Sequence, residues 1–196
     1  DLFNGVADLQ KKIIKTPGKP EDSFSDDPLR MMRAARFMSQ LNFEVDQSVL
    51  VAIKNMAARL EIISAERIRD EFIKIIMSPS PRLGITLLVE TGLADHFLPE
   101  VPKLKLEIDE HNHRKDLYEH SLTVLEQAIA LEDRLAGPNL TLRLAALLHD
   151  IGKPKTKQLI AGGGVSFHHH EVVGARMCKE RMKKLRFDNH IINDVS

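Results

Sequence analysis

The 196-residue sequence predicts a mainly α-helical protein, in which a helical body precedes a second helical domain that contains a small β-hairpin. Three observations lead to this prediction. Aromatic residues make up only 5% of the chain and Trp is absent, so Leu, Ile, Val and Met must form the core, which favours helices over sheets. Apolar residues recur at helical spacing in both halves. Gly and Pro interrupt these runs where helices would end.

The first 27 residues are expected to form a strand and a turn, because residues 7–15 alternate in polarity and Gly and Pro surround them. A lone strand is not stable, so we expect its sheet partners upstream of this sequence. A helix then begins at Pro28, with Asp27 as its N-cap. Further helices of this half are expected over about 48–60, 64–76 and 82–91.

The polar, irregular residues 99–112 indicate a domain boundary. The second half predicts helices over 116–132 and 140–150, a hairpin within 156–167, and helices that start near 170 and 188. We therefore expect three parts: residues 1–27 as the end of a preceding domain, 28–106 as a helical neck and body, and 107–196 as a second domain that is truncated at its C-terminus.

Charge and cysteine content exclude several classes of protein. Lys plus Arg equals Asp plus Glu at 28 each, which argues against general non-specific nucleic-acid binding but not against a local basic face. The single cysteine excludes an internal disulfide and suits a reducing cytosol. No apolar run is long enough to span a membrane and no signal pattern is present. The expected location is the cytoplasm, and the missing initial Met suggests a fragment of a longer protein.

A His-Asp pair ends an apolar helical run and points to a metal site. Burying His149 beside Asp150 without partners would cost several kcal/mol, and a divalent cation would offset that cost. His120 lies on the inward stripe of the 116–132 helix, where it can approach the pair. Such ligands suit Mn, Fe, Ni, Zn or Mg, so the metal stays open. The alternative is that His120 and His149 are hydrogen-bonded core histidines.

The segments YEHSL (118–122) and LLHDIGK (147–153) resemble the HD superfamily of metal-dependent phosphohydrolases. The resemblance implies that His120, His149 and Asp150 hold one or two divalent ions that activate water against a phosphoester. A more distal Asp normally completes such a site, and Asp194 is the late candidate. The segment FHHHEVVG (167–174) resembles a subgroup pattern that would add His170 to the site.

A second set of candidate residues lies in the segment DDPLRMMRAARF (26–37). Asp27 and Arg30 can meet on one helix face and present a hydrogen-bond acceptor beside a donor. Cytosine and adenine both show an exocyclic amine next to an unprotonated ring nitrogen, so such a pair would select them over uracil and guanine. Arg33 extends the basic flank of Arg30. The alternative is an ordinary helix cap with an ion pair.

The same segment, with DLFNGVADL (1–9), ERIRDEF (66–72) and LADHFLPE (93–100), resembles bacterial CCA-adding tRNA nucleotidyltransferases, which are similar to poly(A) polymerase. In that family a Glu-Asp-x-x-Arg motif pairs with incoming CTP or ATP. The resemblance assigns this role to Asp27 and Arg30, and Asp26 stands where Glu is usual. The family's Asp-x-Asp pair, which holds two Mg²⁺ ions, occurs nowhere in this sequence. We therefore expect this chain alone to be inactive in nucleotide transfer.

The leading hypothesis is a fragment of an enzyme that adds CMP and AMP from CTP and ATP to tRNA 3′ ends. The partners would then be tRNA, CTP and ATP, with Mg²⁺ for transfer and an unknown metal in the HD domain. The first alternative is an HD phosphohydrolase that acts on nucleotides or phosphodiesters. The second is a non-catalytic RNA-binding module. The oligomeric state, and whether CCA, only A or only CC is added, stay open.

Overall fold

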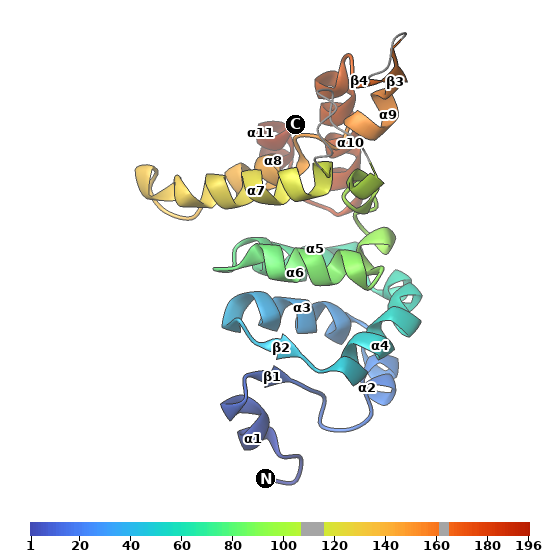
Figure 1. Ribbon diagram of the computed structural model, residues 1–196, viewed down its shortest axis with the longest axis vertical. Helices are drawn as coiled ribbons and strands as arrows, with labels where there is room; N and C mark the ends of the chain where they lie inside the picture. Colours follow the sequence, from blue (N-terminus) through green and yellow to red (C-terminus); the bar gives the residue numbers. More distant parts are fainter. Residues whose placement is uncertain (107–115, 161–164) are drawn as a thin grey trace. The chain divides into compact units, whose positions relative to one another are not determined.

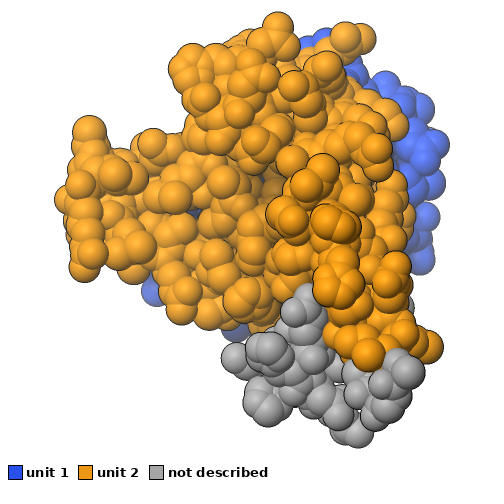
Figure 2. All heavy atoms as spheres, turned by 90° about the horizontal axis from the view of Figure 1, so that it is seen from above, with its two compact units in different colours: residues 1–97 blue, residues 98–196 orange. Residues whose placement is uncertain are grey.

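The computed structural model describes residues 1–106, 116–160 and 165–196. The described chain is mainly helical with a small antiparallel hairpin, as the sequence predicts. It divides into two compact units, residues 1–97 and 98–196 (Figure 2). The division falls close to the irregular segment expected as a boundary. Each unit has its own apolar core, and each carries one of the two candidate sites.

Unit 1 is built around α3, which packs against α5 and α6 (Figure 1). Met31, Met32, Ile75 and Leu88 are almost completely buried in this core. The elements of unit 1 are α1 (Gly5–Gln10), β1 (Ile13–Ile14), α2 (Pro20–Asp26), α3 (Leu29–Leu41), β2 (Glu44–Val45), α4 (Gln47–Met56), η1 (Ala57–Ile62), α5 (Ala65–Ile76), α6 (Pro81–Glu90) and η2 (Leu93–His96).

The N-terminal segment differs from the sequence prediction in three ways. Helix α1 covers residues 7–10 of the expected strand, and within the range 7–15 only Ile13 and Ile14 form a strand. We expected the partners of this strand upstream of the sequence, but within the described residues β1 pairs in parallel with β2, with Ile13 opposite Glu44. A parallel partner lies across a long connection, so local alternation could not reveal it. The helix α2, which buries Phe24, was also not predicted.

The start of α3 follows the expected capping chemistry. Asp27 Oδ1 accepts a hydrogen bond from the backbone N–H of Leu29 at 3.1 Å. This satisfies one of the free donors at the helix N-terminus. The first helical residue is Leu29, whereas the sequence indicated a helix start at Pro28, one position earlier. The carboxylate of Asp27 is therefore fixed where α2 ends and α3 begins.

In unit 2, helix α8 leads into the His-Asp pair and packs among the neighbouring helices. Helix α7 packs against α8, α8 against α11, and α10 against both α9 and α11. In the hairpin, Gln158 pairs with Ser166 and Leu159 with Val165, while the glycine run 162–164 lies outside the described residues. The elements of unit 2 are η3 (Pro102–Leu106), α7 (Leu117–Ala130), η4 (Glu132–Arg134), α8 (Leu140–Leu148), α9 (Lys153–Thr156), β3 (Gln158–Leu159), β4 (Val165–Ser166), α10 (His170–Lys184) and α11 (Asn189–Val195).

A buried ion pair ties η4 to α8. Arg143 donates from Nε and Nη2 to the two carboxylate oxygens of Glu132, at 2.7 and 2.6 Å. The hydrogen bond from Arg143 outweighs the effect of burial and lowers the pKa of Glu132 below its ordinary value of 4.5. Because both partners are buried, removing either would leave an uncompensated charge. The pair therefore holds α8, the helix that ends one residue before His149, at a fixed place beside the end of α7.

No helix in the described ranges combines the length and apolar character that a membrane span requires.

Gly84 offers a direct test of the packing in unit 1. A Cβ at Gly84 would lie 2.7 Å from Ile75 Cγ2 and 3.0 Å from the Ala35 carbonyl oxygen. We expect Gly84→Ala to lower the free energy of unfolding by roughly 1–3 kcal/mol through overpacking. Gly18→Ala is the matched control, since no atom lies within 4 Å of that Cβ. Equal urea midpoints for the two variants would contradict this packing.

Candidate functional site

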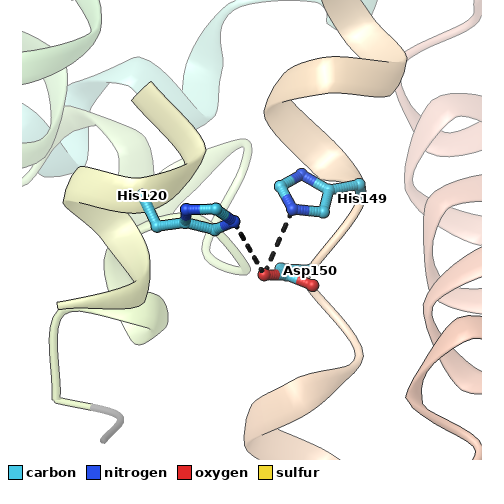
Figure 3. Close-up of side chains that lie close together, drawn as sticks. All are labelled: His120, His149 and Asp150. Atoms are coloured by element: carbon cyan, nitrogen blue, oxygen red, sulfur yellow. Dashed lines mark ion pairs between the residues drawn. The ribbon is translucent and has the colours of Figure 1, made fainter. Parts of the chain in front are cut away.

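The side chains of His120, His149 and Asp150 converge in unit 2 (Figure 3). His120 comes from α7, while His149 and Asp150 follow the last residue of α8. One ligand atom of each residue lies within 4.8 Å of those of the other two. The Nε2 atoms of His149 and His120 are 3.2 and 3.9 Å from Asp150 Oδ2. The structure thus brings together the three residues that the sequence singled out.

Backbone carbonyls determine which ring nitrogen of two of the histidines carries a proton. His149 Nδ1 lies 2.9 Å from the carbonyl oxygen of Ala146, and His170 Nδ1 lies 2.9 Å from that of Phe167. A carbonyl only accepts, so each Nδ1 must donate. In a neutral ring the Nε2 lone pair then stays free, which is the arrangement found in metal-ligating histidines. Both Nε2 atoms face Asp150.

Asp150 is the electrostatic centre of the cluster, with an exposed fraction of only 2%. Burial by itself would raise its pKa, but His149 and Lys153 outweigh this effect and lower the pKa of Asp150 to about 2. Lys153 Nζ lies 3.1 Å from Asp150 Oδ2. For His149, burial by itself would lower the pKa, but the negative charge of Asp150 beside the ring outweighs burial, so that the pKa of His149 is raised above its ordinary value. The carboxylate is therefore ionised at neutral pH.

The donor set fits a divalent transition metal. Asp150 Oδ2 is buried and, despite its ion pairs, takes part in no hydrogen bond of good geometry. Two imidazole nitrogens and one carboxylate oxygen suit Mn, Fe, Ni or Zn. His170 Nε2 lies 3.8 Å from Asp150 Oδ1, at the edge of this cluster. Asp194 lies outside it, because it sits on α11 and pairs instead with His190 at 2.7 Å.

The second candidate site lies at the start of α3 in unit 1. Asp27 Oδ2 accepts from Arg67 at 3.0 Å. Arg30 donates to Ser23 Oγ at 3.1 Å and to the Ser23 carbonyl oxygen at 3.3 Å, and it lies 3.9 Å from Asp26. Asp27 and Arg30 are thus held by different partners, rather than meeting each other on the helix face as the sequence suggested.

Sequence reasoning assigned no role to either of these partners. Arg67 lies within the ERIRDEF segment, but no local spacing connects it with a residue 40 positions away. Ser23 belongs to α2, a helix that the sequence did not predict. Only the tertiary packing of α2, α3 and α5 shows these contacts.

A cavity of about 390 Å³ adjoins the start of α3. Its lining includes the cationic side chains of Lys15, Arg30 and Arg33 and the apolar side chains of Phe24 and Phe37. The cations can attract an anion, while the apolar wall can cover a planar group. A larger cavity of about 510 Å³ lies elsewhere in unit 1 and contains none of the predicted site residues.

Two family models match the chain in tandem. The first is described as "Probable RNA and SrmB-binding site of polymerase A" and matches residues 42–104. The second, the HD domain, matches residues 117–196. The first matched range falls mainly in unit 1, and the second falls wholly in unit 2. The fold and these matches therefore define a helical body that resembles an RNA-binding region of polymerase A, followed by a domain that resembles the HD family.

Curated relatives agree with this class. The chain is 34% identical to the A-adding tRNA nucleotidyltransferase of Deinococcus radiodurans over 95% of its own length and 43% of that protein. It is 47% identical to the CCA-adding enzyme of Limosilactobacillus reuteri over 47% of its own length and 23% of that protein. The chain thus spans less than half the length of these relatives.

Solved structures share the fold. A Thermotoga maritima CCA-adding enzyme complexed with tRNA superposes with a TM-score of 0.64 at 19% identity, over 100% of this chain and 40% of that one. A CCA-adding enzyme with ATP gives 0.63 at 20% identity, also over 100% of this chain and 40% of that one. Along nearly its whole length the chain is therefore similar to the C-terminal part of bacterial tRNA nucleotidyltransferases, which confirms the resemblance seen in the sequence.

The metal site can be tested by titration of the purified chain with Mn²⁺. His149→Ala is expected to weaken binding by more than about 100-fold, because loss of a direct ligand should exceed the 10–100-fold effect of outer-sphere partners. His190→Ala is the matched control, since this imidazole is exposed on α11. Isothermal calorimetry measures both variants. Unchanged affinity in His149→Ala would exclude a metal at this cluster.

Proposed function

We propose that unit 1 selects the base of incoming CTP or ATP for transfer of CMP and AMP to tRNA 3′ ends. The observation that carries this proposal is the fixed placement of Asp27 and Arg30 at the start of α3, beside a cavity with cationic side chains. The names of the relatives and the match to an RNA-binding family model support it. The expected setting is the cytoplasm, where tRNA matures.

The proposed selection works by hydrogen-bond complementarity. The Asp27 carboxylate accepts from the exocyclic amine of cytosine or adenine, and the Arg30 guanidinium donates to the neighbouring ring nitrogen. Uracil and guanine present a donor where Arg30 needs an acceptor. Asp26 balances the charge of Arg30 from 3.9 Å. Lys15 and Arg33 line the same cavity and can approach the phosphates.

Nucleotide binding should therefore depend on base identity and on these two side chains. We expect the purified chain to bind CTP and ATP about 5–100-fold more tightly than UTP and GTP, since a good bidentate pair discriminates by about 1–3 kcal/mol. Asp27→Asn and Arg30→Ala should abolish this preference. Asp22→Asn, an exposed change on α2, is the control. Equal binding of all four nucleotides, measured by calorimetry, would refute base selection by unit 1.

The transfer step itself needs two metal ions held by carboxylates of the Asp-x-Asp type, in practice Mg²⁺. Because the sequence contains no such pair, we expect no incorporation of CMP or AMP into tRNA by this purified chain. Radiolabelled CTP and ATP with a tRNA that lacks its 3′ end provide the assay. Incorporation above that of heat-denatured chain would overturn this expectation.

The second proposed function is metal-dependent hydrolysis of phosphoesters by unit 2. The imidazoles that face the ionised Asp150 support it, together with the HD family match. His120, His149 and Asp150 would hold the divalent metal, which when bound lowers the pKa of a water molecule and polarises the phosphoryl group. Lys153, 3.1 Å from Asp150, would contact a phosphate oxygen and balance its charge.

Hydrolysis of bis(p-nitrophenyl) phosphate in the presence of Mn²⁺ tests this activity. His149→Ala should reduce kcat by more than about 100-fold, whereas Lys153→Met should mainly raise KM because it removes a phosphate contact. His190→Ala should leave both constants unchanged. If the chain shows neither hydrolysis nor nucleotide selectivity, both proposals are refuted, and a non-catalytic RNA-binding module becomes the hypothesis to test by RNA binding.

A further inference from the structure

Gly152 lies two residues after Asp150 at a point where two backbones almost touch. A Cβ at this position would lie 2.1 Å from the carbonyl oxygen of His170, 2.7 Å from the N of Gly174 and 3.0 Å from its Cα. All three neighbours are backbone atoms, so no change of side-chain rotamer could relieve the clash. Gly152 has right-handed helical angles, φ −76° and ψ −25°. Any residue can adopt these angles, so it is the lack of space that requires glycine here.

Gly174 forms the other side of this contact. A Cβ on Gly174 would lie 3.4 Å from Gly152 N, 3.6 Å from Gly152 Cα and 3.8 Å from the His149 carbonyl oxygen. Gly174 lies four residues after His170 in α10, so both occupy the same helix face. The two glycines therefore let the first turns of α10 lie directly against the residues that follow the His149-Asp150 pair.

This contact determines the distance between His170 and Asp150. His170 is the first residue of α10, and its ring is oriented by the 2.9 Å contact of Nδ1 with the Phe167 carbonyl oxygen. Its Nε2 then lies 3.8 Å from Asp150 Oδ1. We propose that Gly152 and Gly174 are positioning residues that place His170 as a further donor to the metal of unit 2. The proposal rests on the metal site proposed above.

The size of the expected displacement supports this role. A carbon atom and an oxygen atom that are not bonded to each other do not settle at 2.1 Å, and optimal separations of heavy atoms are about 3.5–4.0 Å. An Ala at position 152 must therefore push the start of α10 away by roughly 1 Å or more. Metal and catalytic sites tolerate about 0.5 Å of misplacement. Gly152→Ala should thus increase the distance between His170 and Asp150 and remove His170 from the site.

Titration of the purified chain with Co²⁺ tests the proposal through affinity and through the visible absorption spectrum, which changes with the donor set. We expect His170→Ala to weaken Co²⁺ binding about tenfold and to alter the spectrum. Gly152→Ala should show the same affinity and the same altered spectrum. The double variant should be no weaker than either single variant, because both changes remove the same donor. Glu180→Ala, an exposed change on α10, should behave as wild type.

Gly174→Val keeps the proposal testable if Gly152→Ala does not fold, because a Cβ at Gly174 already reaches Gly152 N at 3.4 Å and the two further methyl groups of Val need additional space. We expect a smaller loss, about threefold, with a partial change of the spectrum. Wild-type affinity and spectrum in both glycine variants would overturn the proposal, as would additive losses in the double variant. If wild type and His149→Ala bind Co²⁺ equally, the metal site itself is absent and the proposed positioning role fails with it.

Discussion

The candidate site of unit 2 depends on the interactions that compensate the buried negative charge of Asp150. A charged group with an exposed fraction of 2% is stable only when charge and hydrogen bonding offset its desolvation. Lys153 and His149 supply that compensation from the same stretch of chain, and His120 and His170 approach from α7 and α10. The packing of these helices therefore has to bring compensating groups to one buried charge, and the same packing brings together a candidate set of metal ligands.

The candidate site in unit 1 has a related construction. Asp27 is fixed at the start of α3 by the backbone N–H of Leu29 and by Arg67 from α5. One carboxylate oxygen thus caps the helix and the other accepts from a guanidinium. Arg30 is fixed independently by Ser23. Carboxylates held at helix ends can present their remaining acceptor positions to a ligand with little loss of conformational entropy.

Local patterns predicted the features that depend on neighbours in the sequence. Helical periodicity indicated α3, α5, α6, α7 and α8, and adjacency indicated His149 with Asp150. Contacts between distant segments were not accessible in this way: the parallel pairing of β1 with β2, the ion pair of Arg67 with Asp27, and the approach of Gly152 to Gly174. Each of these depends on how preformed elements pack, which periodicity and capping rules do not specify.

A crystal structure of the chain grown with Mn²⁺, with anomalous differences recorded near the Mn absorption edge, tests the central claim most directly. The claim is that the side chains around Asp150 form a divalent metal centre. We predict an anomalous peak in contact with His120, His149 and Asp150, which disappears in crystals of His149→Ala. A wild-type crystal that shows no peak at this cluster, or a peak that persists unchanged in His149→Ala, would contradict the claim.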